Sequence, residues 1–407
     1  MFLKNNYKIF IKIYFSLIVF LTLYYLAVRN SDLTYNAMTE WVINYQGGFV
    51  RRGLLGEVVF QISNLFNLNL RFSFLIFQSF LYLIYYYLIY SLIKDLKLNY
   101  FILLSIFSPI FIIFPVAELE ALGRKEILIF IALVISIDLY FRFKNNNLLI
   151  LFISIIFPIL LLTHESSIFY SLFFISLILI TKKEIDSFYL FKIILFSIPS
   201  LASVYAIFYY PHLPEETMQM CEELRKVGEN CGLATVFLSK NIGFHKSELG
   251  WEIDHIFRYV FIFFVGFFGL IYLSFKSKFN ELKINKIFCN HPFIFHLLIL
   301  ILPTFAMFFI AVDTGRWIHM SFTCSFIYYF GLLKNNALVL ENKIFSLNLK
   351  SEKLNKTLYA LFFFIICLSW NPKAVYHEDL GSLPLYRALE KFPNYYKSLY
   401  EIQMFRQ

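Results

Sequence analysis

Charged side chains are scarce in this sequence of 407 residues: Asp, Glu, Lys and Arg make up only 15% of it, against 59% for the hydrophobic types. So few charges among so many apolar residues exclude a water-soluble globular domain and indicate a membrane protein. We therefore attribute the net charge of +9 to orientation in a membrane and expect no binding of nucleic acid.

The apolar runs also lack the alternation that marks the strands of a membrane β-barrel. They are longer than such strands and apolar on all sides. The sequence therefore predicts an all-α fold, a polytopic membrane helical bundle of about eleven transmembrane helices, each close to the length that crosses the hydrocarbon core. The expected spans are 10–28, 73–93, 100–115, 127–142, 148–163, 167–181, 192–210, 259–275, 292–312, 318–333 and 357–370.

No internal repeat and no low-complexity linker divides the chain. We therefore expect residues 1–407 to form a single multi-span membrane domain, with two bundles split at the loop 211–258 as the alternative. No small-residue cleavage site follows the basic, apolar start, so residues 1–28 are expected to be an uncleaved first span.

Lysines predict the orientation, because they are enriched in cytoplasmic loops. With a cytoplasmic N-terminus, most lysines fall on the inside, whereas of the arginines only Arg142 does. The lysine-bearing inner loops are then 94–99, 143–147, 182–191, 276–291 and 334–356. The outer segments are a first outer loop 29–72, a large periplasmic loop 211–258 and a C-terminal tail 371–407 with a helix expected over 380–407.

Four polar clusters interrupt the apolar pattern, and all four map to the outer ends of spans. Ionisable groups at membrane depth are costly and are a functional hypothesis by default. The clusters are "GGFVRRGLLGE" (47–57), "AELEALGRKE" (117–126), "LTHESS" (162–167) and "VDTGRW" (312–317).

In the first cluster, the paired Gly47 and Gly48 permit unusual backbone angles or the close approach of a ligand. Arg51 and Arg52 cannot share one helix face, so at least one is expected to point inward. A turn with interfacial arginines is the simpler alternative. The cluster is not a nucleotide-binding loop, because Leu54 stands where that motif requires lysine.

The other three clusters combine acids with bases. In the second, Glu120 and Arg124 precede a span, where carboxylates also favour the helix dipole. In the third, His164 and Glu165 form a pair suited to a general base and its orienting group. In the fourth, Asp313 and Arg316 either bind a ligand or pair with each other, and Trp317 is an expected interfacial anchor.

Only five cysteines are present. Cys221 and Cys231 lie in the large outer loop, near a short amphipathic helix expected over 218–228, and outside the cytosol they can form a disulfide; two free thiols are the alternative. No ligand spacing typical of a metal site occurs, so we expect neither a metal nor another cofactor.

Arginines and carboxylates on the side away from ATP suit an anionic substrate that carries its own leaving group. A sugar linked to polyprenyl phosphate or diphosphate fits, because arginines bind phosphate and stabilise the charge that develops as the sugar is released. His164, Glu165, Asp313 or Glu120 would take the proton of the acceptor hydroxyl. Gly47, Gly48, Arg51, Arg52, Arg124, Arg316 and Trp317 would contact the substrate.

The clusters "GGFVRRGLLG", "GRKE", "HE" and "DTGRW", on a chain of this layout, resemble two groups of bacterial membrane glycosyltransferases. One is the O-antigen or capsular polysaccharide polymerases, which implies polymerisation of undecaprenyl-diphosphate-linked oligosaccharide in the cell inner membrane, for lipopolysaccharide or capsule, with a chain-length regulator as a possible partner. The other is the GT-C class, which uses polyprenyl-phosphate sugars and would make Asp32 or Glu40 the catalytic residue.

A transporter or flippase for the same lipid-linked sugars is the third hypothesis. It predicts charges deep within spans and at both faces, whereas these spans are nearly free of charge and the clusters lie on one side. A partner-binding membrane protein would leave the four clusters unexplained.

Overall fold

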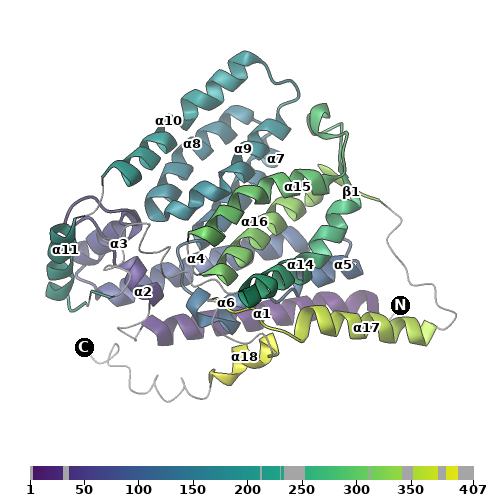
Figure 1. Ribbon diagram of the computed structural model, residues 1–407, viewed down its shortest axis with the longest axis horizontal. Coiled ribbons are helices and arrows are strands. Elements are labelled where there is room, and N and C mark those ends of the chain that lie inside the picture. Colours follow the sequence, from purple (N-terminus) through teal and green to yellow (C-terminus); the bar gives the residue numbers. More distant parts are fainter. Residues whose placement is uncertain are drawn as a thin grey trace.

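The computed structural model describes residues 3–30, 36–210, 213–229, 231–232, 253–310, 313–341, 352–374 and 382–392. Most of this part of the chain is helical, and the long helices pack against one another (Figure 1). Most buried apolar side chains belong to one continuous core.

Five helices in the described part of the chain are long and apolar enough to cross a membrane. This confirms the prediction of an all-α protein of the membrane class, while the count of eleven spans stays a prediction. The five are α1 (Leu3–Asn30), α4 (Leu70–Ile93), α8 (Asn146–Thr163), α10 (Ser187–Tyr209) and α14 (Ile253–Phe275).

The other expected spans coincide with shorter or interrupted helices. These are α5 (Tyr100–Ile106) with α6 (Phe114–Ala117), α7 (Ile127–Phe143), η2 (Glu165–Tyr170) with α9 (Ser171–Thr181), α15 (Phe293–Ile301) with η4 (Leu302–Phe309), α16 (Thr314–Lys334) and α17 (Glu352–Leu368). Three further helices are short: η1 (Leu119–Ala121), η3 (Lys286–Phe288) and α18 (Pro384–Glu390).

The expected continuous span over 100–115 is wrong. Helix α5 ends at Ile106, and α6 begins only at Phe114. Pro109 disfavours helical geometry at the residue before it, and Pro115 occupies the first turn of α6, where the missing N–H is tolerated. The chain therefore turns at this level and brings the segment 117–126 into the core.

Helix α16 is the central helix. Every residue of it from Thr314 to Leu332 is buried, and it contacts α4, α7, α14, α15 and η4. A helix surrounded in this way needs no polar face. Trp317, expected as an interfacial anchor, is only 3% exposed, so that prediction is wrong.

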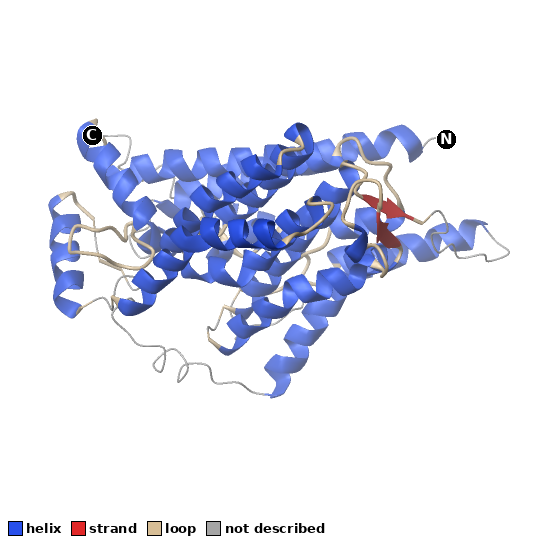
Figure 2. Cartoon of the chain, turned by 90° about the horizontal axis from the view of Figure 1, so that it is seen from above, coloured by secondary structure: helices blue, strands red, loops and turns tan. Residues whose placement is uncertain are grey.

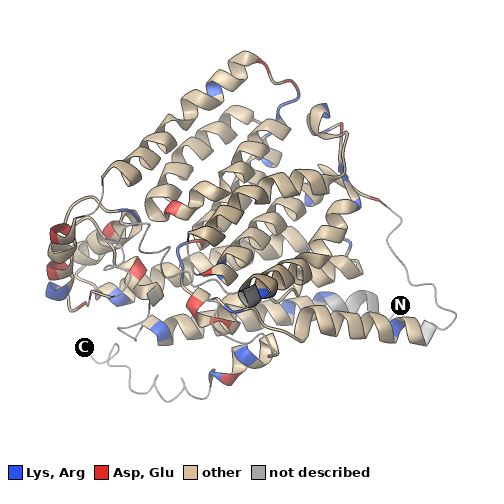
Figure 3. Ribbon diagram, in the orientation of Figure 1, with Lys and Arg blue, Asp and Glu red and all other residues tan. Residues whose placement is uncertain are grey.

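The two ends of the bundle differ. Helices α2 (Asn36–Trp41), α3 (Leu54–Leu65) and α11 (Pro214–Lys226) lie at one end, and the antiparallel strands β1 (Ser277–Phe279) and β2 (Leu338–Leu340) lie at the other, near the start of α1 (Figures 1 and 2). Acidic and basic residues mix at the first end (Figure 3). We call these the polar end and the strand end.

Lysine-bearing loops meet at the strand end. Asn285 Nδ2 donates to the carbonyl of Lys182 at 2.9 Å, and Lys283 Nζ donates to that of Asn335 at 2.6 Å. Three of the loops expected to share the cytoplasmic side therefore share one end of the molecule. Which side of a membrane that end faces stays a prediction.

Helix α11 packs over the polar end. Its buried residues Thr217, Met220, Cys221 and Leu224 form one helical stripe. A Cβ at Gly47 would lie 2.0 Å from the carbonyl oxygen of Glu216. The helix therefore packs directly on the glycine loop.

Two further links hold the segment 213–232. Cys221 and Cys231 form a disulfide, with Cα atoms 5.3 Å apart. Buried Arg71 of α4 binds Glu229 through two nitrogens, with Nε–Oε1 and Nη2–Oε2 distances of 2.7 Å. The expected helix over 218–228 is observed as Pro214–Lys226; of the helix expected over 380–407, the described residues contain α18 alone.

Candidate functional site

The four polar clusters of the sequence come together where the polar end meets the buried core. They meet in a single group of charged side chains to which α2 adds a fifth contribution, Glu40. We call this group the ion-pair network. It consists of Glu40, Arg51, Arg52, Arg124, Glu126, His164, Glu165, Asp313 and Arg316.

Arg52 joins three of the segments. Its Nε and Nη2 bind the carboxylate of Glu165, with Nε–Oε2 2.7 Å and Nη2–Oε1 2.6 Å, while Nη1 reaches Glu40 Oε1 at 3.3 Å. The contact to Glu165 is the bidentate geometry in which arginine binds carboxylates and phosphates most strongly. The loop after α2 is thereby held to the first residue of η2.

The backbone of Arg52 is strained. Its φ of +68° lies in the left-handed region, which costs a residue with a side chain about 1–3 kcal/mol when the surroundings impose it. Lys125 Nζ donates to the carbonyl of Arg52 at 2.6 Å. The lysine therefore holds the conformation that turns the Arg52 side chain into the network.

Glu40 lies at the centre of the network. Its Oε1 accepts from Arg52 and lies 3.1 Å from Arg124 Nη1. Burial alone would raise the pKa of Glu40, but Arg124, Arg316 and Arg52 outweigh it and hold the pKa well below its usual range. Within the described chain, Oε2 of this buried, ionised carboxylate has no hydrogen-bond partner.

A second buried carboxylate lies at the start of α7. Glu126 Oε1 binds Arg316 Nη2, and Arg316 Nη1 binds Asp313 Oδ2 at 2.6 Å. His164 Nε2 is 3.8 Å from the same Glu126 oxygen. Arg316 therefore bridges Asp313 and Glu126, beyond the simple pairing with Asp313 that the sequence suggested.

His164 presents an N–H to this carboxylate. Its Nδ1 accepts from the backbone N–H of Ser166 at 3.3 Å, which leaves the proton of the neutral ring on Nε2. Burial and then the charge of Arg52 lower the pKa of His164, so the ring is neutral near pH 7. Among the described residues, neither His164 Nε2 nor Glu126 Oε2 has a hydrogen-bond partner.

Arg51, Arg52, Glu165 and Asp313 form the more accessible side of the network. Side chains of Arg51 and Arg52 are 24% and 26% exposed, whereas those of Glu40 and Arg316 are buried. Among the described residues, Arg51 makes a single ion pair, a long one from Nη1 to Glu165 Oε1 at 3.6 Å. Burial lowers the pKa of Arg51, the Arg52 charge adds to this, and Glu165 offsets it only in part.

Lys125 is buried within the network, 1% exposed. Its Nζ also lies 5.7 Å from the Trp41 ring centre. Burial, opposed by Glu40, lowers the pKa of Lys125 to about 7. This lysine therefore changes charge near neutral pH.

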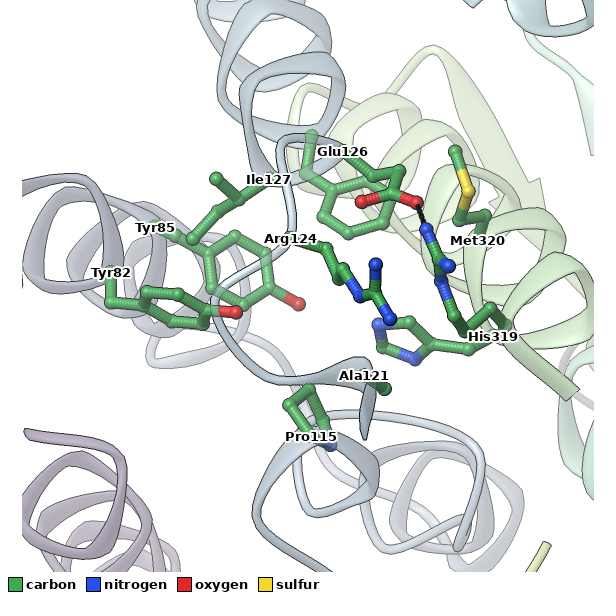
Figure 4. Close-up of a pocket in the computed structure, with 11 residues that line it drawn as sticks. Tyr82, Tyr85, Pro115, Ala121, Arg124, Glu126, Ile127, His319 and Met320 are labelled. Carbon is green, nitrogen blue, oxygen red and sulfur yellow. Dashed lines mark hydrogen bonds and ion pairs between the residues drawn. The ribbon is translucent and has the colours of Figure 1, made fainter. Parts of the chain in front are cut away.

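A small cavity adjoins the buried side of the network. It has a volume of about 20 Å³ and is lined by residues that include Arg124, Glu126 and Arg316. That is room for about one water molecule. Figure 4 shows the Arg124 guanidinium pointing into this space toward the His319 ring.

Some residues proposed from the sequence lie elsewhere. Gly47 and Gly48 approach Glu216 of α11, so the close contact there is with protein and not with a ligand. Glu120 lies at the edge, 3.9 Å from Arg124 and 42% exposed. Trp317 lies beneath Arg316, whose Cζ is 5.2 Å from the ring centre.

Three charged residues were not among the primary predictions. Glu40 was named only for the GT-C alternative, together with Asp32, which lies outside the described residues. Glu126 and Lys125 belong to the quoted "GRKE" cluster but were given no role. A usable signal was present for Glu40, because it is a lone carboxylate in the apolar stretch "MTEWVI".

Comparison of the chain with protein-family models, with curated proteins and with solved structures finds no match.

Proposed function

We propose that the ion-pair network is the catalytic centre of a membrane glycosyltransferase that uses a sugar linked to polyprenyl phosphate or diphosphate. One observation carries the proposal. Glu40, a buried, ionised carboxylate whose Oε2 has no hydrogen-bond partner among the described residues, contacts Arg52, and Arg52 shares Glu165 with the partly exposed Arg51. A base beside a phosphate-binding group is the pair that such a transfer needs.

The phosphate of the donor would bind at Arg51 and Arg52. Within the described part of the chain Arg51 makes one ion pair at 3.6 Å and donates no hydrogen bond, so its five N–H donors are available. Its buried charge is incompletely compensated by Glu165. An added phosphate would therefore find a partly desolvated guanidinium, where charge-assisted hydrogen bonds are strong.

The acceptor hydroxyl would bind deeper, between His164 and the two glutamates. It would accept from His164 Nε2, beside Glu126, and donate to Oε2 of Glu40, which has no hydrogen-bond partner among the described residues. The hydroxyl oxygen bonds to the anomeric carbon, the bond from that carbon to the phosphate oxygen breaks, and the phosphate leaves with the electron pair. The carboxylate takes the hydroxyl proton.

Donor binding and base strength are coupled in this arrangement. Arg52, one of the three arginines that keep the pKa of Glu40 low, is also one of the two groups that a phosphate would bind. A phosphate that draws Arg52 away from Glu40 raises the pKa of that carboxylate toward the working pH, where a general base is most effective. The carboxylate is thus a weak base until the donor is present.

Two versions of the reaction follow from the resemblances. As a polymerase, the protein would join undecaprenyl-diphosphate-linked oligosaccharides at the periplasmic face of the inner membrane, for O-antigen or capsule. The central place of Glu40, an acid of the first outer loop, favours the alternative, transfer of a single sugar from polyprenyl phosphate. A chain-length regulator is a partner only in the first version.

Arg51→Ala is the cleanest test of phosphate binding, because Glu165 keeps Arg52 as its partner and no buried charge is left unpaired. The matched control is Arg225→Ala on the exposed face of α11. In a deletion strain, the control is expected to restore the surface polysaccharide seen on gels, and Arg51→Ala to lower it by about tenfold or more.

The gel also separates the versions. Loss of the long ladder with one repeat unit retained indicates a polymerase, and a full ladder that lacks a branch sugar indicates single transfer. Accumulation of an inward-facing precursor would indicate a flippase and contradict the proposal, as would normal polysaccharide with Arg51→Ala.

A further inference from the structure

An apolar slot runs between α8, α9 and α10. Its volume is about 230 Å³, and α10 forms its outer wall at the edge of the bundle (Figure 1). Leu201 is 59% exposed and Ile175 39%, so the slot is open along one side. It is lined by sixteen residues, among them Ile153, Phe157, Ile168, Ser171, Ser197 and Ser200.

The sequence explains why these helices leave a space. Serine occupies four lining positions, 154, 171, 197 and 200, and is too small to fill the gap between the helices. Pro158 lies inside α8 and Pro199 inside α10, and a proline in a helix interior removes a hydrogen bond and bends the helix. The two helices contact each other extensively, and the small serines leave the slot between them.

The slot leads to the ion-pair network. Glu165 and Ile168 are three residues apart in the 3-10 helix η2, and side chains with this spacing lie on the same face. Ile168 lines the slot, whereas Glu165 binds both Arg51 and Arg52. The arginine side of the network thus lies about one helical turn beyond the end of the slot.

The slot has the width of a single lipid chain and room for a short stretch of it. On α8 its lining runs from Ile150 to Leu161, and on α10 from Ile193 to Val204. Eleven residues of rise correspond to about 17 Å along each helix. A narrow slot of this length with cationic groups at one end matches a single chain that carries an anionic head group.

We propose that this slot holds the first isoprene units of the donor lipid, with its phosphate at Arg51 and Arg52. The inference rests on the proposed function and deepens it by placing the substrate. It commits to a single-chain polyprenyl phosphate, because a bilayer phospholipid carries two chains and the slot accommodates one.

Filling the slot tests the proposal. Ser200→Phe places a ring in the slot, and Ile198→Phe places the same ring on the exposed face of α10. Binding of undecaprenyl phosphate to the purified full-length protein in detergent is measured by native mass spectrometry. We expect Ser200→Phe to weaken binding by about tenfold or more and Ile198→Phe to leave it unchanged.

Two further measurements keep the result interpretable. Ser197→Leu fills the slot with a smaller side chain, in case Ser200→Phe does not fold, and is expected to weaken binding in the same direction. Phosphatidylglycerol is added as a competitor and is expected to displace the polyprenyl lipid poorly. Unchanged binding in the slot variants, or equal displacement by phosphatidylglycerol, would overturn the proposal.

The assay separates this inference from the proposed function. Slot-dependent binding of undecaprenyl phosphate in a protein that transfers no sugar would support the slot and contradict the glycosyltransferase. Full transfer activity with normal lipid binding in Ser200→Phe would contradict the slot alone.

Discussion

At the scale of single residues, Arg52 and Lys125 depend on each other. Arg52 adopts a left-handed conformation, and Lys125 caps its carbonyl from within the core. Charged groups surround the lysine: Glu40 from α2, Arg52 from the following loop and Glu165 from η2, with Glu126 beside it in sequence. The charge of Lys125 therefore bears on the whole ion-pair network.

The lowered pKa of Lys125 predicts that the free energy of unfolding rises with pH. Its pKa is about 7 when folded and about 10.4 when unfolded. Between these values the unfolded chain binds one proton more, so the free energy of unfolding increases with pH, by on the order of 4 kcal/mol from this residue. Below pH 7 both states are protonated and this contribution is absent.

Lys125→Met removes the titration. Thermal unfolding in detergent at pH 6.5 and pH 9.5 is expected to show a larger gain in Tm for the unmodified protein than for the variant. An identical pH dependence in both proteins would show that the lysine does not titrate in this window.

At the scale of elements, α11 closes the polar end. The disulfide Cys221–Cys231 holds the end of the segment, and the buried pair Arg71–Glu229 ties it to α4. Because α11 packs on Gly47, these links also set the position of the loop that carries Arg51 and Arg52.

Replacing only one partner of the pair Arg71–Glu229 should destabilise the protein more than replacing both partners. Arg71→Met leaves a carboxylate buried without its partner, which costs about 3–5 kcal/mol. The double variant Arg71→Met with Glu229→Leu has no unpaired charge and should unfold at a higher temperature than Arg71→Met alone. Additive losses in the double variant would contradict this account of the pair.

At the scale of the whole molecule, the account requires the polar and strand ends to face opposite sides of a membrane. Phe66, after α3, is 65% exposed, and Leu282, near β1, is 85% exposed. An impermeant thiol reagent applied to spheroplasts should label a Phe66→Cys variant at once and a Leu282→Cys variant only after permeabilisation. If both variants were labelled from outside, the two ends would not face opposite sides of the membrane, and this prediction would be wrong.

The sequence predicted which segments form the candidate site better than it predicted how they are paired. One-sided clusters were enough to expect Arg52, Arg124, His164 and Arg316 on one face, because charged groups cluster at helix ends in such a chain. The partners were not predictable, because Arg52 reaches Glu165 across 113 positions of sequence.

Two errors have physical causes. Hydropathy alone does not show that Pro109 and Pro115 interrupt an apolar run, so the expected span over 100–115 was continuous. Trp317 was expected at an interface because tryptophan is enriched there, but α16 is surrounded by other helices and buries it.

We propose that Glu40 is the base of the glycosyl transfer, and this role can be tested directly. The protein is reconstituted in proteoliposomes together with polyprenyl-linked sugars extracted from the cells that produce it. The release of polyprenyl phosphate or diphosphate is then measured. Glu40→Gln keeps the size of the side chain and removes the carboxylate, and Glu223→Gln makes the same change in an exposed pair on α11.

We expect the Glu223→Gln variant to transfer sugar at the rate of the unmodified protein. We expect the Glu40→Gln variant to remain folded and to transfer sugar about 100-fold more slowly, or slower still. Equal rates for the two variants would contradict this role of Glu40.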